Sequence, residues 1–350
     1  MNYNKFIDSV IIKTPQFIEK LIDKETNLYN FSIEGDLHKT MPLSSSVFVS
    51  KILHMLNINN NDSKKFLNNH ILSFYKSDEK LIYDNYIKKK SLVKRFLKTI
   101  IYRNTRYFSY KPSSIAETRQ SLSALICNDY DKKIKVDYIS DYEEIIKQII
   151  KLDWSKPWHA CSQLSHIIFL IKYYENDLVK IFSIIDFVEN NYRLKSGGWG
   201  KNENISIQQK INGSMKMMTI FMLDSKLQNF NYKNQLIDLC LSSINNKHAC
   251  DNFNIICCLF NCSIENDYRK NEIKDFALSR IKIYKKYFFD EIGGFSFYIN
   301  KSQDYYYDAK VTKGKNTPDL QGTTLFLWGI VMISNILETK HYKNFKLPTT

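Results

Sequence analysis

The sequence predicts an all-α protein, an (α/α)6 toroid in which two concentric rings of helices surround a central cavity. The 350 residues include only 10 glycines and 6 prolines, which is typical of a helical chain. A unit of two helices recurs about every 40 to 60 residues. Within each unit a half-polar helix is followed by one that is apolar almost all round; an open solenoid of helix pairs is the other arrangement that fits.

The first helix of each unit is amphipathic. In the segment 141–154, Ile145, Ile146 and Ile149 recur at helical spacing and Asp141 stands at the N-cap position. Five segments follow this pattern: 62–75, 141–154, 177–192, 231–244 and 271–288. Each is predicted to keep one face in water, which places it in the outer ring.

The second helix of each unit is more uniformly apolar and begins with small or hydroxyl-bearing residues. Six segments have this character: 43–56, 117–127, 159–173, 212–223, 251–262 and 321–337. A helix that is apolar on nearly every side is a buried helix. These segments are therefore expected to form the inner ring.

Glycine pairs mark two of the loops that precede inner helices. One pair, at 197–198, stands before Trp199, and the other, at 293–294, stands before Phe295. Two successive glycines allow a tight turn that carries a buried aromatic side chain. Both loops are therefore predicted to be tight turns.

This unit of an outer helix, a GGW or GGF loop and an inner helix with a polar start resembles the repeats of the terpenoid cyclase and protein prenyltransferase superfamily. The resemblance covers about residues 28–337 and implies a toroid with a central cavity. The chain is then one domain over 1–350, with an N-terminal helix in 1–27 and a tail in 338–350. Toroids of this shape also house glycoside hydrolases, polysaccharide lyases, sugar epimerases and lanthionine cyclases, so the fold leaves the reaction open.

The polar residues at the starts of the inner helices are the candidate site, because in a toroid these starts meet at one rim of the cavity. Orphan N–H groups at such starts favour an anionic ligand. The candidate acids and bases are Glu117, His159, His166 and Asp319. The candidate substrate-binding residues are Arg119, Gln120, Trp158, Gln163, Trp199, Asn212, Lys216 and Gln321.

A polar stripe runs along the helix that begins near residue 159. His159, Gln163 and His166 are spaced i, i+4 and i+7 and share one helical face. Buried polar groups need partners, which are either neighbouring side chains or a ligand. A histidine there is suited to general acid or base chemistry near neutral pH. Aromatic residues of 295–307 and Trp328 are suited to stack on a sugar or to stabilise a carbocation.

The two candidate carboxylates have two interpretations each. Glu117 is either an acid or base or a first-turn residue that complements the helix dipole, and Arg119 is a clamp for a carboxylate or phosphate. Asp319 is either a helix N-cap or the second of two carboxylates facing each other across the cavity, as an inverting glycosidase requires.

No metal ion or cofactor is predicted. The chain has neither the DDxxD nor the DxDD motif of terpenoid chemistry, and its nearest strings, at 129–131 and 251–252, depart from both. No paired CxxC spacing supports a zinc site. No P-loop, GxGxxG or GxSxG motif occurs either.

Charge and cysteine content bear on partners and location. Fifty Lys and Arg against 36 Asp and Glu give a net charge of +14, which favours an anionic partner. Lys88, Lys89 and Lys90 predict a basic helix face, interpreted either as a peripheral membrane contact or as a solvated surface. No nucleic-acid partner is expected, because no reading motif accompanies the run. Seven irregularly spaced cysteines and the lack of a signal-peptide pattern predict the cytoplasm.

The leading hypothesis is an enzyme resembling terpenoid cyclases and prenyltransferases that acts in the cavity on an isoprenoid or a polyprenyl-linked saccharide. One alternative is a carbohydrate-active toroid, a hydrolase, lyase or epimerase of polysaccharide metabolism. It predicts an open polar groove, whereas the isoprenoid hypothesis predicts a deep apolar pocket. The other alternative is a non-catalytic scaffold, in which the polar residues at the helix starts bind only one another.

Overall fold

The computed structural model describes residues 3–34, 41–89, 92–101, 109–243 and 246–350. These residues form fourteen α-helices and three two-stranded antiparallel ribbons, so the predicted all-α class is confirmed. The ribbons pair β1 (Tyr75–Lys76) with β2 (Leu81–Ile82), β3 (Phe288–Phe289) with β4 (Gly294–Phe295), and β5 (Tyr305–Tyr306) with β6 (Ala309–Lys310). No helix in the described ranges combines the length and the apolar character that a membrane crossing needs.

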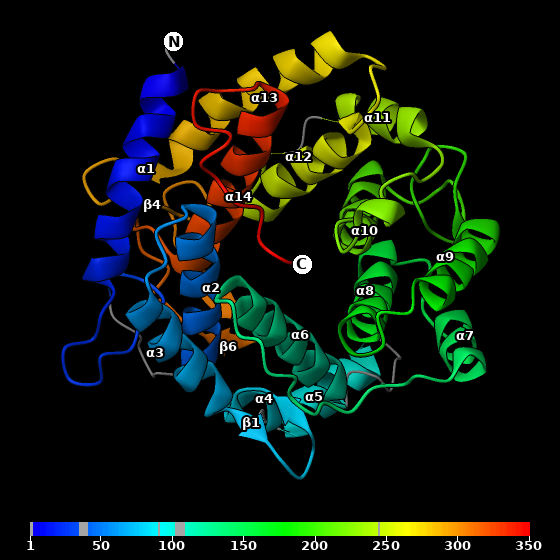
Figure 1. Ribbon diagram of the computed structural model, residues 1–350, viewed down its shortest axis with the longest axis horizontal. Coiled ribbons are helices and arrows are strands. Elements are labelled where there is room, and N and C mark those ends of the chain that lie inside the picture. The colour runs from blue at the N-terminus through cyan, green and yellow to red at the C-terminus, as the bar shows by residue number, and fades with distance from the viewer. Residues whose placement is uncertain (1–2, 35–40, 90–91, 102–108, 244–245) are drawn as a thin grey trace.

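Six helices pack on one another in a closed sequence around a common centre (Figure 1). They are α2 (Pro42–Met55), α6 (Lys111–Cys127), α8 (Pro157–Tyr174), α10 (Ile207–Phe221), α12 (Ala249–Ser263) and α14 (Leu320–Ile336), called the inner helices below. Each packs against the next, and α14 returns to pack against α2. They correspond to the six segments predicted to be apolar almost all round.

The remaining helices lie outside this group. They are α1 (Tyr3–Lys20), α3 (Asn61–Leu72), α4 (Asn85–Lys89), α5 (Leu92–Ile101), α7 (Tyr142–Ile150), α9 (Leu178–Tyr192), α11 (Lys233–Leu241) and α13 (Lys270–Tyr284). Helix α3 packs on α2, α7 and α9 pack on α8, α11 packs on α12, and α13 packs on α12 and α14. The five amphipathic segments predicted from the sequence are all among them.

Side-chain caps begin two of the five amphipathic helices at the first residue of the predicted segment. The carboxylate of Asp141 accepts from the N–H of Glu144 at 2.8 Å, and that of Asp177 accepts from the N–H of Lys180 at 2.9 Å. Each cap satisfies an N–H that the first turn of a helix leaves without a partner. The starts of α7 and α9 are therefore encoded locally, whereas Asn60 caps α3 one residue before the helix, and α11 and α13 begin without a side-chain cap.

Four outer helices end earlier than predicted: α7 stops at Ile150, α11 stops at Leu241, and two others give way to strands. The segment 62–75 stops being helical at Leu72, and the segment 271–288 stops at Tyr284. The last residues of both segments, Tyr75 and Phe288, lie in strands that pair with the following turn. An antiparallel pair needs extended backbone, which a helix does not provide.

Two inner helices begin earlier than predicted. Helix α6 already contains Glu117 in its second turn, and α10 already contains Asn212 in its second turn. Pro112 lies in the first turn of α6, where backbone N–H groups have no partner within the helix, so a proline there costs no hydrogen bond. Ser206 caps the start of α10. The prediction that Glu117 and Asn212 stand at helix starts is therefore wrong.

A short antiparallel backbone pairing recurs in the loops that join successive helices. Four residues pair with a residue shortly before them in the chain: Tyr29, Ile82, Trp199 and Phe295. Oγ1 of Thr118 accepts from the N–H of Ile82 at 3.0 Å and donates to its carbonyl at 2.9 Å. Thr323 makes the same two contacts with Phe295, at 3.0 and 3.3 Å. The repeat thus extends to its turns.

The predicted tight turns are present at both glycine pairs. Gly197 has a φ of +85° and Gly293 a φ of +95°, in the left-handed region that favours glycine. A Cβ on Gly293 would also lie 2.1 Å from the carbonyl oxygen of Lys13, so the turn packs directly on α1. Trp199, which follows the first pair, is fully buried.

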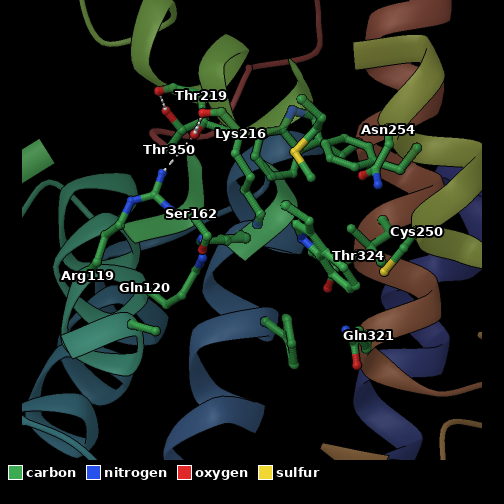
Figure 2. Close-up of a pocket in the computed structure, with 18 of the residues that line it drawn as sticks. Arg119, Gln120, Ser162, Lys216, Thr219, Cys250, Asn254, Gln321, Thr324 and Thr350 are labelled. Atoms are coloured by element: carbon green, nitrogen blue, oxygen red, sulfur yellow. Dashed lines mark hydrogen bonds between the residues drawn. The ribbon is translucent and has the colours of Figure 1, made fainter. Parts of the chain in front are cut away.

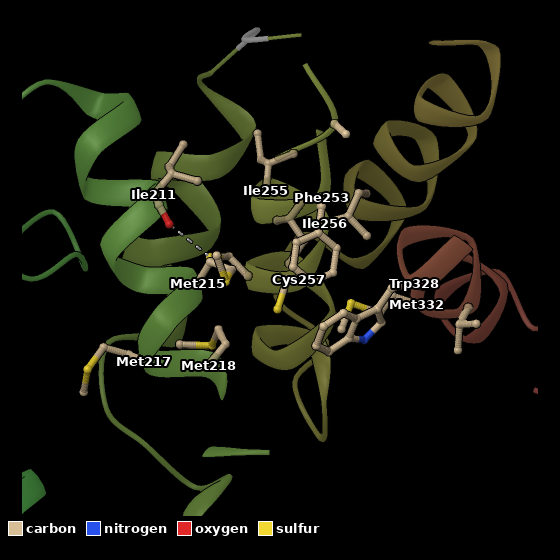
Figure 3. Close-up of a cluster of buried hydrophobic side chains, with 14 of the residues drawn as sticks. Ile211, Met215, Met217, Met218, Phe253, Ile255, Ile256, Cys257, Trp328 and Met332 are labelled. Carbon is tan, nitrogen blue, oxygen red and sulfur yellow. Dashed lines mark hydrogen bonds between the residues drawn. The ribbon is translucent and has the colours of Figure 1, made fainter. Parts of the chain in front are cut away.

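Three inner helices share a sulfur-rich apolar core (Figure 3). Met215 and Met218 of α10, Cys257 of α12, and Trp328 and Met332 of α14 are all buried in one cluster. This packing holds three helices in fixed register and so sets where their polar residues emerge.

Candidate functional site

A cavity of about 310 Å³ lies among the six inner helices. Every inner helix contributes to its wall, together with the β5–β6 ribbon and Thr350 (Figure 2). Seven of the predicted site residues line it: Arg119, Gln120, Trp158, His159, His166, Lys216 and Gln321. Segments far apart in the sequence therefore meet at this one place.

Three cationic side chains reach the cavity from different helices. Lys51 of α2 and Arg119 of α6 are 3% and 2% exposed, and Lys216 of α10 extends into the cavity (Figure 2). Lys51 donates to the amide oxygen of Gln120, and Nη2 of Arg119 donates to Oγ1 of Thr219 at 3.2 Å. In the described part of the chain, Nζ of Lys216 has no hydrogen-bond partner, and no Asp or Glu side chain lines the cavity.

Lys51 and Arg119 are buried and Lys216 is partly buried, and none of the described residues places a carboxylate in the cavity wall beside them. Burial, and then the neighbouring positive charge of Arg119, lowers the pKa of Lys216 to about 8. Burial is also the largest cause that lowers the pKa of Lys51 to about 7. The pKa of Arg119 falls to about 10, again through burial. The cavity is therefore a place of uncompensated positive charge.

Two histidines of α8 differ in their exposure. His166 is buried, and its pKa is lowered well below the ordinary value by burial and then by the charges of Arg119 and Lys216. His159 is exposed at the end of the cavity, with its ring stacked on Trp158 at a centroid distance of 5.9 Å. Both imidazoles are neutral near pH 7 and can accept a proton.

Aromatic and aliphatic side chains form much of the remaining wall. The rings of Phe253 and Trp328 lie 4.7 Å apart between centroids, and Phe48 meets Tyr306 edge-on at 5.4 Å. Tyr306 and Tyr307 come from the aromatic segment 295–307 that the sequence analysis singled out. The cavity thus combines an apolar wall with a cationic one.

Four polar atoms in the wall are buried without a hydrogen-bond partner. They are Nε of Arg119, Oδ1 of Asn254, Oε1 of Gln321 and Nε1 of Trp328. Buried polar atoms in proteins are nearly always hydrogen-bonded. The cavity wall therefore offers two donors and two acceptors that no described residue satisfies.

Glu117 lies behind the wall, not in it. Its Oε2 accepts from the N–H of Asp84 at 2.7 Å, and its Oε1 accepts from Oγ of Ser44 at 2.9 Å. Burial raises the pKa of Glu117 to about 8. The carboxylate joins the turn after β2 to α2 and α6, and it does not line the cavity.

Asp319 is the N-cap of α14, which confirms the N-cap interpretation of this residue. Its carboxylate accepts from the N–H groups of Gly322, Phe297 and Gln303, at 2.8, 2.8 and 3.0 Å. Burial raises the pKa of Asp319 to about 7, against the opposing effect of these N–H donors. Because Asp319 and Glu117 both face backbone groups, the predicted pair of carboxylates across the cavity is not formed.

The other predicted residues also lie outside the cavity. Gln163 is half-buried on α8, and Ser162 takes its place in the wall. Trp199 fills the turn before α10, where its Nε1 donates to Glu189 at 3.0 Å. Asn212 is buried within α10 and accepts from Nδ2 of Asn254 at 2.7 Å. Asn212 therefore orients a residue of the wall instead of forming it.

Lys51 is the main residue that the sequence analysis missed. It is the lone charge in the apolar stretch SSSVFVSKILHML, and Lys216 is likewise the lone charge in NGSMKMMTIFML. A charged residue is rarely fully buried unless it has a partner. A single cation within an otherwise apolar inner helix is therefore the signal that identifies both lysines.

Comparison of the chain with protein-family models and with curated proteins finds no match. Within the described ranges, no group of three or more His, Cys, Asp or Glu side chains is placed to hold a metal ion. The geometry itself defines the class of site. It is a small cavity with two buried cations and one partly buried cation, neutral histidines and an aromatic wall.

Proposed function

We propose that the chain is a single-domain (α/α)6 toroid of the kind found in terpenoid cyclases and protein prenyltransferases. We further propose that it is an enzyme whose cavity binds an isoprenoid carrying a phosphate or diphosphate group. The observation that carries the proposal is a set of three cations in one cavity, Lys51 and Arg119 buried and Lys216 partly buried, beside an aromatic and aliphatic wall. The closed sequence of packing from α2 to α14 and back supports the two-ring arrangement.

An anionic group on the ligand would offset the free-energy cost of the positive charges in the cavity. One pKa unit corresponds to about 1.4 kcal/mol, so the lowered pKa values of Lys51 and Lys216 mean that each charge costs the empty protein several kcal/mol. A phosphate offers several strong acceptor oxygens and negative charge. Accepting from both lysines and from the free Nε of Arg119 would offset that cost.

The apolar part of the ligand would lie against the aromatic wall. Trp158, Phe253 and Trp328 present ring faces and edges, and Met215 and Leu325 add aliphatic surface. A volume of about 310 Å³ is at the small end for small-molecule sites. We therefore assign the cavity a short isoprenoid and not a long polyprenyl chain.

The proposed reaction uses the cationic group first and His166 second. The C–O bond to the phosphate breaks, and its electron pair remains on the phosphate oxygen, where the three cations stabilise it. The rings of Trp158 and Trp328 stabilise the carbocation that forms. His166, or His159 nearer the opening, then accepts a proton from the carbon next to the cation, which leaves an alkene.

Calorimetric titration tests this proposal with three probes, geranyl diphosphate, geraniol and inorganic diphosphate. We expect geranyl diphosphate to bind most tightly, and Lys216→Met to weaken it about tenfold to a hundredfold, the worth of a charge-assisted hydrogen bond. Lys147→Met, on the exposed face of α7, is the matched control and should leave binding unchanged. Equal binding of geraniol, or unchanged binding by Lys216→Met, would overturn the proposal.

A phosphorylated or acidic saccharide is the second candidate ligand. It is favoured by Oδ1 of Asn254, Oε1 of Gln321 and Nε1 of Trp328, which offer unpartnered acceptors and a donor to hydroxyl groups. The same titration with an oligouronate distinguishes the two candidates. Tighter binding of the saccharide, lost in Gln321→Leu, would move the assignment to carbohydrate chemistry.

We also propose a reducing location, the cytoplasm. All seven cysteines carry free thiols, and six of them are buried. Burial raises the pKa of the remaining one, Cys250, to about 12, which keeps it a protonated thiol. Mass spectrometry of protein alkylated under native conditions, with and without reductant, checks the free thiols.

A further inference from the structure

One surface segment is cationic along its whole length. From Asn85 to Ile101 the chain has no Asp or Glu and six basic residues, Lys88, Lys89, Lys90, Lys94, Arg95 and Lys98. The segment contains α4 and α5. Its charge alone fits either a solvated surface or an anionic partner.

Helix α5 adds a second feature, an exposed apolar face. Phe96, Leu97, Ile100 and Ile101 are 57%, 50%, 56% and 69% exposed, and are called the α5 face below. Their spacing of i, i+1, i+4 and i+5 places them on one side of the helix. Within the described ranges, α5 packs closely against no other helix or strand.

We propose that the α5 face docks on an anionic lipid membrane, with the helix lying in the plane of the headgroups. An exposed apolar helix face in a segment rich in Lys and Arg is the pattern of helices that bind membrane interfaces. Lys88 is paired with Glu79 at 2.6 Å, and the positive charge of the other five basic residues complements the negative surface of anionic lipids. This contact is separate from the cavity, since no residue of α5 lines it.

The charge of the segment argues against the other occupants of this face. A second copy of the chain would bring six basic residues against six more, and like charges facing each other repel. A nucleic acid would neutralise the basic side but would leave the four apolar side chains in water. A lipid surface accommodates the exposed apolar face and the positive charge of the segment at once, because acyl chains lie directly beneath charged headgroups.

Sedimentation with lipid vesicles tests the proposal on the full chain. We expect the protein to bind vesicles that contain phosphatidylserine and to stay in solution with pure phosphatidylcholine. Phe96→Ser/Ile100→Ser should lower the partition coefficient by about tenfold or more, since two of the four apolar side chains of the α5 face are removed. Ile150→Ser/Val179→Ser removes two exposed apolar side chains from α7 and α9 and is the matched control.

Three results would overturn the proposal. They are a wild-type protein that does not sediment with phosphatidylserine vesicles, a control variant as impaired as the α5 variant, and a dimer in light scattering that the α5 variant abolishes. Far-UV circular dichroism establishes that both variants are folded. Because titration of geranyl diphosphate is done without lipid, failure of either proposal is recognised independently of the other.

Discussion

Replacing Lys216 with Met is expected to stabilise the empty protein while it weakens anion binding. Lys216 extends from α10 into the cavity, and its ammonium group has no hydrogen-bond partner among the described residues (Figure 2). Methionine is also unbranched and flexible, and it fills a similar space without a charge. The substitution therefore removes the cost of the buried charge and little of the packing.

The magnitude follows from the pKa of Lys216. Its ordinary value is 10.5 and its value in the folded protein is about 8, a difference of 10.5 − 8 = 2.5 units. At about 1.4 kcal/mol per unit, the charged lysine makes the folded state about 3 kcal/mol less stable relative to the unfolded chain. At pH 7 the lysine is charged in both states, so the free energy of unfolding of Lys216→Met should be higher by about that amount.

The difference depends on pH with a definite sign. A lysine whose folded pKa is lowered releases its proton more readily in the folded state, so the unfolded chain binds more protons between pH 8 and 10.5. The stability of the wild type relative to Lys216→Met therefore rises through this window. The two proteins should converge near pH 10.5 and differ fully below pH 8.

Urea unfolding at pH 7 and pH 10, followed by tryptophan fluorescence, measures this difference. Lys147→Met, which removes an exposed lysine of α7, should show no such change between the two pH values. A destabilised Lys216→Met protein at pH 7, or a difference that is the same at both pH values, would refute the reasoning. Either result would mean that the ammonium group has a partner in the folded protein.

Three further changes test the structural assignments. Asp319→Asn should destabilise the protein by about 2 to 3 kcal/mol, because the carboxylate caps α14 and accepts from two other N–H groups, yet leave ligand affinity unchanged in titration. Lost affinity without lost stability would return Asp319 to the catalytic residues. Gly293→Ala should lower the free energy of unfolding, measured by thermal denaturation, by at least about 2 kcal/mol, since φ is +95° and the new Cβ would lie 2.1 Å from the Lys13 carbonyl oxygen. A variant that unfolds at the temperature of the wild type would contradict this. Thr118→Val should cost about 1 kcal/mol in urea unfolding, because the N–H of Ile82 loses its acceptor, and a neutral result would place a different acceptor there.

The helices could be predicted from the sequence because the evidence for them is local. Apolar residues at three- and four-residue spacing report which side of a segment is buried, whatever it is buried against. Caps such as Asp141 act within one turn, so the residue that begins a helix is also readable. Tyr75 and Phe288 were wrongly predicted to be the last residues of helices, because both pair with a strand that lies further along the chain.

The candidate site could be predicted only in part. Arg119, His166 and Lys216 are polar residues in apolar inner helices, and the cavity contains all three. Glu117 is just as polar and stands two residues from Arg119, but Asp84 and Ser44 occupy its carboxylate. Nothing within the segment 117–127 distinguishes the two outcomes.

Sequence alone determined the helical class, the alternation of half-polar and apolar helices, and the tight turns at the glycine pairs, since each depends on residues close together in the chain. Tertiary structure decided which polar side chains share the cavity. Lys51, Arg119 and Lys216 lie on three separate helices, and the closed packing of the inner helices brings them together. Whether a buried polar group has a hydrogen-bond partner depends on atoms from other segments of the chain. The sequence alone therefore does not distinguish a carboxylate that accepts from backbone N–H groups from a cation that has no partner.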